Sequence, residues 1–319
     1  MKKVICAAGT LAAAALAGGY WGFQHACRRV PDPDWEDETS LEKSAYAEFA
    51  VSIPVAAKWL RDHGAEDVYT TSFDGLRLAG KWVPAEKPKA TIILFHGYHT
   101  HYLHDFAGIF SMYHSIGLNL LLVRQRAHGE SEGTYITFGV RERKDVLSWV
   151  DFHNRTHGMD NVFLGGMSMG ASTVLFAAGE DLPPNVRGIT ADCGFSSPAE
   201  IMAHVIRRDY HLPPKLVLPL MNVWSRALGG FGLWECSTRR TLAKAHVPII
   251  FIHGKADTFV PCAMSREGYD ACSSKKELIE VEGAGHGRSY LFDPEGLTRA
   301  LVDFFNRNLS PEYTQEATS

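Results

Sequence analysis

A chain of 319 residues with 45% hydrophobic and 21% charged residues has the composition of a folded globular protein, which excludes a disordered, collagen-like or multi-span membrane chain. Its 32 basic and 36 acidic side chains leave a net charge of −4, so the positive excess that nucleic-acid binding requires is missing and no nucleic-acid partner is expected. Six cysteines without a CxxC pair indicate neither a dense disulfide framework nor a zinc ribbon.

Residues 1–30 form a hydrophobic segment between two basic pairs, at positions 2–3 and 28–29. The stretch from Val4 to Cys27 contains no Lys, Arg, Asp or Glu. Because a helix of roughly 20 residues crosses the hydrocarbon layer, we expect an uncleaved single-pass membrane anchor, and hence membrane association. Two alternatives stay open: a signal peptide cleaved near residues 15–17, which would give a secreted protein, and a buried or peripheral helix.

Residues 31–65 are expected to form a linker followed by an N-terminal helical region. The linker is acidic and interrupted by Pro31 and Pro33. The spacing of apolar residues from Ser40 to His63 predicts an amphipathic helix that is broken or turned at Pro54.

Residues 66–309 alternate between short apolar runs typical of strands and longer helical patterns. This alternation of strands and helices predicts an α/β fold with a mostly parallel central sheet and helices on both faces. The first two strands form a hairpin, and the last is polar enough for a sheet edge. The expected strands are Val68–Thr71, Leu76–Val83, Thr91–Phe95, Asn119–Val123, Val162–Leu164, Val186–Ala191, Pro248–Ile252 and Lys276–Val281. Residues 310–319 are expected to be a frayed tail.

One segment, residues 194–241, interrupts this alternation because it contains no credible strand. It combines prolines and glycines with large apolar side chains. We expect a helical cap insertion that covers a pocket, with Tyr210, Met221 and Trp224 contacting substrate.

The nucleophile motif follows a predicted strand and precedes a predicted helix. Gly166-x-Ser168-x-Gly170 in that context is the pattern of a nucleophile elbow, a sharp turn that exposes the serine hydroxyl. A serine hydroxyl is a weak nucleophile at neutral pH, so it needs a base and a carboxylate that orients the base. Two later strands run into Asp257 and His286. The chain order Ser168, Asp257, His286 therefore predicts a catalytic triad.

A fourth strand runs into His96-Gly97-Tyr98-His99. The backbone amides of Tyr98 and Met169 are expected to form an oxyanion hole, since a backbone donor after such a His-Gly pair can join the one after the nucleophile.

These motifs resemble the α/β-hydrolase superfamily over residues 68–309, and most closely its serine aminopeptidase-like and monoglyceride-lipase-like esterase branch. Residues 126–133 resemble the Arg-Gly-x-Gly-x-Ser-x-Gly segment of that branch. Two positions differ from the branch pattern: Ala127 replaces a glycine, and Arg124 stands where many relatives have aspartate. The resemblance implies a serine hydrolase that needs no metal or organic cofactor and acts on esters, lipids, thioesters or amino-terminal amides.

Other polar residues near the strand ends are expected to be structural. The histidines at 96, 99, 101 and 104 lack the Glu or Cys companions of a metal site, so no metal is expected. Asp192 also ends a strand and is the alternative triad acid, but Asp257 is favoured.

Two hypotheses for function follow. The first is a serine hydrolase that cleaves a carboxylic ester or related acyl bond of a small molecule through an acyl-enzyme. The second is a membrane-tethered binding protein that keeps the fold without turnover. The complete triad favours the enzyme.

Overall fold

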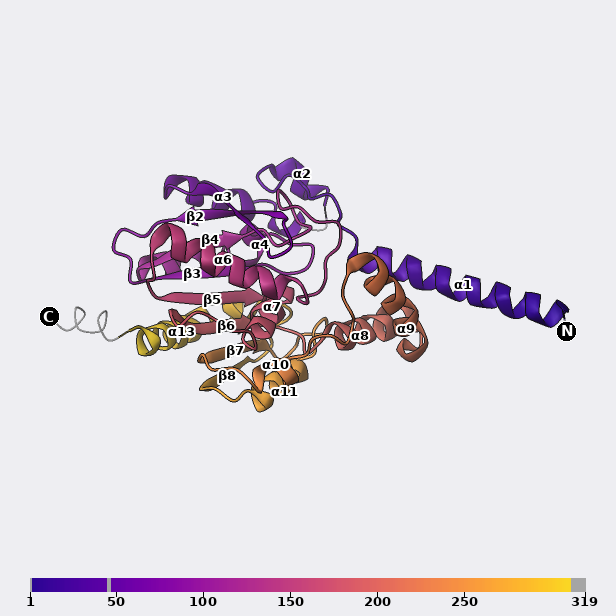
Figure 1. Cartoon of the computed structure of the whole chain (residues 1–319). Coiled ribbons are helices and arrows are strands. Elements are labelled where there is room, and N and C mark those ends of the chain that lie inside the picture. Colours follow the sequence, from indigo (N-terminus) through magenta and orange to yellow (C-terminus); the bar gives the residue numbers. More distant parts are fainter. Residues whose placement is uncertain (1, 45–46, 311–319) are drawn as a thin grey trace.

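The computed structural model describes residues 2–44 and 47–310. All of the expected tail except Ser310 therefore lies outside the described residues. Figure 1 shows a central sheet with helices packed around it, and a long N-terminal helix, α1 (Lys2–Cys27), that extends away from the sheet beside α8 (Pro198–Tyr210) and α9 (Pro214–Trp224).

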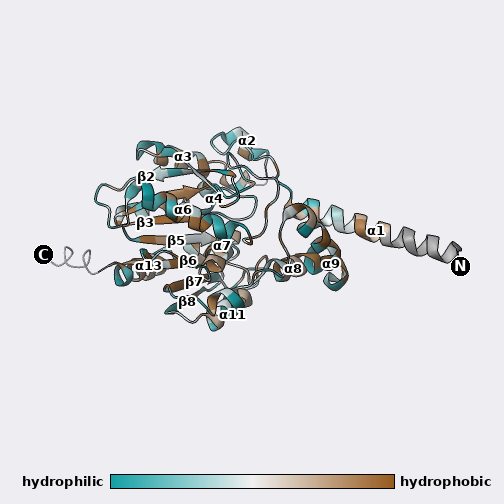
Figure 2. Ribbon diagram, viewed as in Figure 1, coloured by the Kyte–Doolittle hydropathy of each residue, from teal (hydrophilic) through white to brown (hydrophobic). Residues whose placement is uncertain are grey.

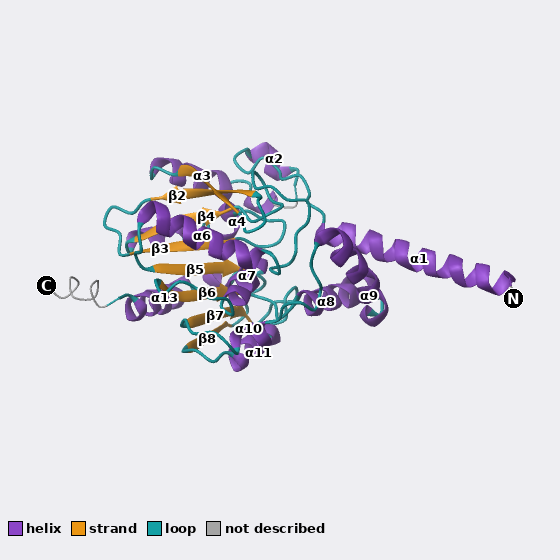
Figure 3. Cartoon of the chain, in the orientation of Figure 1, coloured by secondary structure: helices purple, strands orange, loops and turns teal. Residues whose placement is uncertain are grey.

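Eight strands form one mixed sheet in the order β1-β2-β4-β3-β5-β6-β7-β8 (Figure 3). β1 and β2 form an antiparallel hairpin, β2 pairs antiparallel with β4, and all later neighbours pair in parallel. The expected mostly parallel sheet is confirmed, and β8 lies at its edge. The strands are β1 Glu66–Thr71, β2 Arg77–Val83, β3 Ala90–Phe95, β4 Leu118–Val123, β5 Val162–Met167, β6 Val186–Asp192, β7 Ile249–Gly254 and β8 Lys276–Val281.

Helices cover both faces of the sheet because alternate strand residues point to opposite sides. On one face Ile92 and Leu94 pack against α3, α5 and α13, and on the other Ile93 and Phe95 pack against α6, α7 and α10. Figure 2 shows hydrophobic residues concentrated on the strands. The remaining helices are α2 Glu38–Glu42, α3 Ser52–Asp62, α4 Tyr102–Asp105, α5 Phe110–Ser115, α6 Glu142–His157, α7 Met169–Ala177, α10 Thr238–Leu242, α11 Ala263–Ala271, α12 Ser289–Phe292 and α13 Pro294–Asn308.

The N-terminal helical region differs from its sequence-based expectation. An amphipathic helix broken or turned at Pro54 was expected from Ser40 to His63, whereas the region contains α2, a 3-10 turn at Ala47–Phe49 and α3. Pro54 lies in the first turn of α3, where the proline nitrogen replaces an N–H that has no partner within the helix.

The expected single-pass membrane anchor is wrong. In the part of the chain that the structure describes, no helix combines the length and the hydropathy that crossing a membrane requires. α1 has 26 residues, so its length is sufficient. Its composition falls short, because alanine and glycine dominate the segment and contribute much less to membrane insertion than leucine or isoleucine.

The segment 194–241 leaves the sheet after β6 and returns before β7. It contains α8 and α9, here called the insertion helices, a π-helical turn at Ser225–Gly229 and part of α10. Figure 3 shows the insertion helices beyond the ends of the strands, on the same side of the molecule as α1.

Candidate active site

Ser168 lies in a strained turn between β5 and α7. Its backbone has φ 53° and ψ −114°, outside the regions that a serine ordinarily occupies. Two glycines permit this turn. A Cβ on Gly166 would overlap the Gly170 backbone, and a Cβ on Gly170 would overlap the Phe95 carbonyl. The sequence around Ser168 therefore folds into the sharp turn that the Gly-x-Ser-x-Gly pattern predicts.

Ser168, His286 and Asp257 are joined by two hydrogen bonds. His286 Nε2 lies 2.9 Å from Ser168 Oγ, and His286 Nδ1 lies 2.7 Å from Asp257 Oδ2. Ser168 and Asp257 are buried, while His286 is partly exposed on the loop after β8. The structure thus brings together three side chains that lie far apart in the sequence.

The Asp257 carboxylate is held by four groups. Its Oδ1 accepts hydrogen bonds from the amides of Phe259 and Val260, at 2.8 and 2.9 Å. Its Oδ2 contacts His286 and also His253 Nε2, which lies 3.2 Å away. Burial works to raise the pKa of Asp257, but the hydrogen bonds from His253, His286 and Val260 outweigh it and hold the pKa below its ordinary value. Asp257 is therefore ionised and can orient an imidazole.

Asp192, the alternative acid, lies nearby but has another partner. Ser289 Oγ donates to its carboxylate at 3.0 Å, and its backbone carbonyl accepts from the amide of Ser168 at 2.8 Å. Burial raises the pKa of Asp192 to about 6, against the opposing effects of His253 and the Ser289 hydrogen bond. His286 directs Nδ1 to the Asp257 carboxylate.

The two residues of the expected oxyanion hole lie near Ser168: Met169 follows it in the chain, and Tyr98 lines the same two cavities. Met169 is the first residue of α7, so its amide has no acceptor within the helix. Tyr98 follows Gly97, whose amide donates to Asp105 at 2.6 Å and so fixes the loop after β3. The Tyr98 hydroxyl donates to the carbonyl of Ala26 in α1 at 2.9 Å.

The histidines after β3 do not converge on a common point. His96 Nδ1 lies 2.8 Å from the Gly97 carbonyl, His101 accepts from the Leu103 amide, and His104 pairs with Asp105. Among the described residues, one group that could hold a metal is Cys193, Asp257 and His286. Burial, with Asp192 and Asp257, raises the pKa of the Cys193 thiol well above its ordinary value. A thiol held protonated is a poor ligand and nucleophile.

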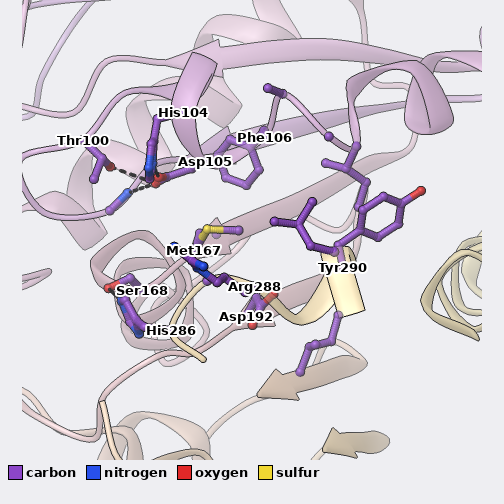
Figure 4. Close-up of a pocket in the computed structure, with 18 of the residues that line it drawn as sticks. Thr100, His104, Asp105, Phe106, Met167, Ser168, Asp192, His286, Arg288 and Tyr290 are labelled. Atoms are coloured by element: carbon purple, nitrogen blue, oxygen red, sulfur yellow. Dashed lines mark hydrogen bonds and ion pairs between the residues drawn. The ribbon is translucent and has the colours of Figure 1, made fainter. Parts of the chain in front are cut away.

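Two cavities meet at Ser168. The first, here called the charged cavity, has a volume of about 530 Å³ and is lined by Glu48, Asp105, Asp192 and Arg288 together with aromatic side chains. Figure 4 shows Ser168 and His286 side by side on the wall of this cavity. The second, here called the apolar cavity, has a volume of about 560 Å³ and lies between α1 and the insertion helices.

The three residues expected to contact substrate occupy different positions. Tyr210 and Met221 line the apolar cavity, as does Ser168. Trp224 is not among the described residues that line either cavity. It packs edge-on against Tyr20, and its indole N–H donates to the carbonyl of Leu16 at 2.9 Å.

Sequence reasoning missed two contributors to the site. His253 was given no role beside Asp257, although its position four residues before Asp257 could have suggested a contact. α1 was treated as a separate segment, although Gly18, Gly22 and Ala26 line the apolar cavity. No local pattern could have indicated the second contribution, because the facing residues lie about 200 positions later.

Comparisons with known proteins agree with this architecture. The family model described as serine aminopeptidase, S33, matches residues 86–228. The chain is 28% identical over 329 residues to the uncharacterized protein YqkD of Bacillus subtilis, covering 98% of this chain and 100% of that protein.

Solved structures show the same fold. The Pyrococcus furiosus esterase Pf2001 superimposes with a TM-score of 0.65 at 23% identity, covering 79% of this chain and 96% of that one. Est1E of Butyrivibrio proteoclasticus, solved with ferulic acid bound, has a TM-score of 0.57 at 17% identity and covers 76% of this chain and 98% of its own. Together with the family match over residues 86–228 and the eight-stranded sheet, these likenesses show that the chain has the α/β-hydrolase fold.

Proposed function

We propose that the protein is a serine hydrolase that cleaves carboxylic esters through an acyl-enzyme intermediate. One observation carries the proposal: Ser168, His286 and Asp257 form a continuous hydrogen-bonded relay at the point where two cavities meet. Such a relay activates a hydroxyl, and the cavities give both halves of an ester a place to bind.

In the proposed mechanism, Ser168 Oγ attacks the ester carbonyl while His286 Nε2 accepts the hydroxyl proton. The C–O bond to the leaving alcohol then breaks, and His286 returns the proton to the alcohol oxygen. A water molecule, deprotonated by the same histidine, attacks the acyl-enzyme and releases the acid. Asp257 orients His286 and stabilises its protonated form. The chemistry needs no metal or organic cofactor.

The amides of Tyr98 and Met169 are the proposed oxyanion hole. Backbone donors aimed at the developing oxyanion stabilise the transition state more than the ground state. The rigidity of both donors supports the assignment, because Asp105 fixes the loop before Tyr98 and α7 begins at Met169.

We assign the apolar cavity to the acyl group and the charged cavity to the leaving group. The apolar cavity is lined mainly by aliphatic and aromatic side chains from α1 and the insertion helices. The segment 194–241 would accordingly act as a substrate cap, inserted within a hydrolase domain of residues 66–309. The esterase Pf2001 and Est1E, with its bound ferulic acid, agree with an ester substrate.

Labelling with a fluorophosphonate probe tests the nucleophile. The wild-type protein should form a covalent adduct on Ser168, and Ser168→Ala should abolish it. Ser168→Ala and His286→Ala should each lower kcat on a p-nitrophenyl ester by roughly four to six orders of magnitude, because triad members act as a unit. Circular dichroism checks that each variant remains folded.

Ser172→Ala is a matched control for the probe, because Ser172 is a buried serine one helical turn after the nucleophile. This variant should still be labelled. A folded wild-type protein that reacts with neither probe nor ester would contradict the proposed function. Faster turnover of an aminoacyl-nitroanilide than of every ester would move the substrate class to amino-terminal amides.

A further inference from the structure

One wall of the apolar cavity comes from the N-terminal helix. Seven of its lining residues belong to α1, and they extend from Ala15 to Ala26. At a rise of about 1.5 Å per residue, this wall runs for roughly 16 Å along the helix axis. The opposite wall comes from the insertion helices, including Val205, Leu220 and Met221, and Ser168 lies on the same cavity.

Two glycines bring α1 into close contact with α9. A Cβ on Gly19 would lie 2.6 Å from Leu220 Cβ, and a Cβ on Gly22 would lie 3.3 Å from Met221 Cγ. Larger side chains at either position would push the helices apart. The small residues therefore set the width of the cavity between the helices.

Hydrogen bonds fix the C-terminal half of α1. The Trp224 indole donates to the Leu16 carbonyl at 2.9 Å, and the Tyr210 hydroxyl lies 3.0 Å from His25 Nε2. Where α1 ends, the Ile136 amide donates to the Cys27 carbonyl at 2.7 Å. These contacts join the helix to both insertion helices and to the body of the protein.

We propose that α1 is the outer wall of the acyl-binding site and that Gly18 is a specificity-determining position for esters of medium- and long-chain aliphatic acids. This inference rests on the proposed serine hydrolase activity and adds its substrate class. The cavity begins at the nucleophile and follows α1 for several turns, so an extended aliphatic chain attached to Ser168 would lie along the helix. The apolar lining favours such a chain over a polar acyl group.

Gly18 offers a direct test because it lines the cavity and a Cβ placed there meets no other atom within 4 Å. A series of Gly18→Ala, Gly18→Leu and Gly18→Phe would fill the cavity progressively. Each replacement also raises helix propensity, so loss of the fold is not the expected result. Ala17→Phe is the matched control, because Ala17 is exposed and is not among the described lining residues.

The measurement is kcat/KM for p-nitrophenyl acetate, butyrate, octanoate and decanoate. The wild type should prefer the longer esters. Gly18→Phe should lower the ratio of decanoate to acetate efficiency by about tenfold or more, the effect of excluding about two methylene groups from the cavity. Gly18→Leu should give an intermediate ratio, and Ala17→Phe should keep the wild-type ratio.

Fluorophosphonate labelling separates the two possible failures. If Ser168 is labelled but the length profile is the same in Gly18→Phe and the wild type, α1 is not the acyl wall and the hydrolase proposal stands. An equal change in Ala17→Phe would also overturn the assignment of Gly18. If the wild type is not labelled and cleaves no ester, the proposed function itself fails.

Discussion

His253 lies behind the proposed triad, fully buried at the end of β7. Its Nε2 contacts Asp257 and the Val260 carbonyl, and its Nδ1 lies 2.6 Å from Ser265 Oγ. The imidazole thereby joins Asp257 to the loop whose amides also bind this carboxylate. We infer that His253 is a positioning residue, which acts on His286 through Asp257.

Replacing His253 should slow the chemical step. His253→Leu removes a hydrogen bond to a charged carboxylate, so kcat should fall by about 10- to 100-fold while KM changes little. Steady-state kinetics on one ester measures both parameters. His253→Gln, which retains a donor, should recover part of the loss. Equal changes in kcat and KM in both variants would indicate a general packing defect.

Asp192 should make the stability of the protein depend on pH. Its folded pKa of about 6 is above the ordinary 3.8, so folding favours the protonated form. Below pH 3.8 the carboxyl is protonated in both states, so Asp192 does not lower the free energy of unfolding. That free energy falls as the pH rises from 3.8 through 6, because the carboxyl ionises more readily in the unfolded chain. Asp192→Asn should therefore be more stable than wild type at pH 7, by up to roughly 3 kcal/mol, and close to it at pH 4. Urea unfolding at both pH values measures this difference.

At single positions, local sequence predicted the sharp turn at Ser168 better than the surroundings of the proposed catalytic residues. Ser168 follows from its flanking glycines, because only a sharp turn requires them. Ala127 was noted as a departure from the related pattern, and its backbone has φ 61°, the conformation for which a glycine is usual. The contacts of His253 are also local, to Asp257, Val260 and Ser265, but they depend on how the segment after β7 folds back over the imidazole.

At the scale of the elements, the conformation of the loop after β4 depends on Arg126. The guanidinium is buried and binds both oxygens of Asp145 at 2.6 Å, and it also contacts Asp74 in the β1–β2 turn at 2.9 Å. Burial works to lower the pKa of Arg126, but hydrogen bonds to Asp145 and Asp74 outweigh it and raise the pKa. These ion pairs explain why the segment 126–133 begins with an arginine.

Arg126→Met should destabilise the protein by about 3–5 kcal/mol, because it leaves the buried Asp145 carboxylate without its cation, whereas Asp74 keeps its ion pair with Arg141. Chemical denaturation at neutral pH measures the change. Arg155→Met is the control: Arg155 forms an exposed pair with Asp151, which contributes about 0.5 kcal/mol or less. Similar losses in the two variants would show that Arg126 is no more important than a surface arginine.

The strands were predictable almost to their ends, whereas the N-terminal helix was assigned the wrong environment. Successive residues of a strand point to opposite faces of the sheet, so a short apolar run can be assigned from its own sequence. Ile92 and Ile93, for example, pack on opposite faces. An apolar helix needs a covering surface, but its own sequence does not say whether lipid or protein provides it. For α1 that surface includes Leu220, Met221 and Trp224.

On the scale of the whole molecule, α1 should be protected from proteolysis as long as it packs against α9. Gly19→Leu places a side chain where Leu220 already lies, and overpacking of this kind costs about 1–3 kcal/mol. Chymotrypsin should therefore cleave near Tyr20 and Trp21 about tenfold faster in this variant than in the wild type. Mass spectrometry identifies the cut. Gly18→Ala should behave as wild type, and equal cleavage in all three proteins would contradict this packing.

The meeting of two unlike cavities at one serine also bears on inhibitor design. A covalent inhibitor could carry an aliphatic tail for the space beside α1 and a polar group for the charged cavity, whose lining includes Arg288 as well as Glu48, Asp105 and Asp192, on either side of one electrophile. Each arm would contact different elements, α1 and the insertion helices on one side and the loops after β3 and β8 on the other. The tail and the polar group could therefore be optimised separately, and selectivity over proteins of this fold that lack an N-terminal helix would come from the tail.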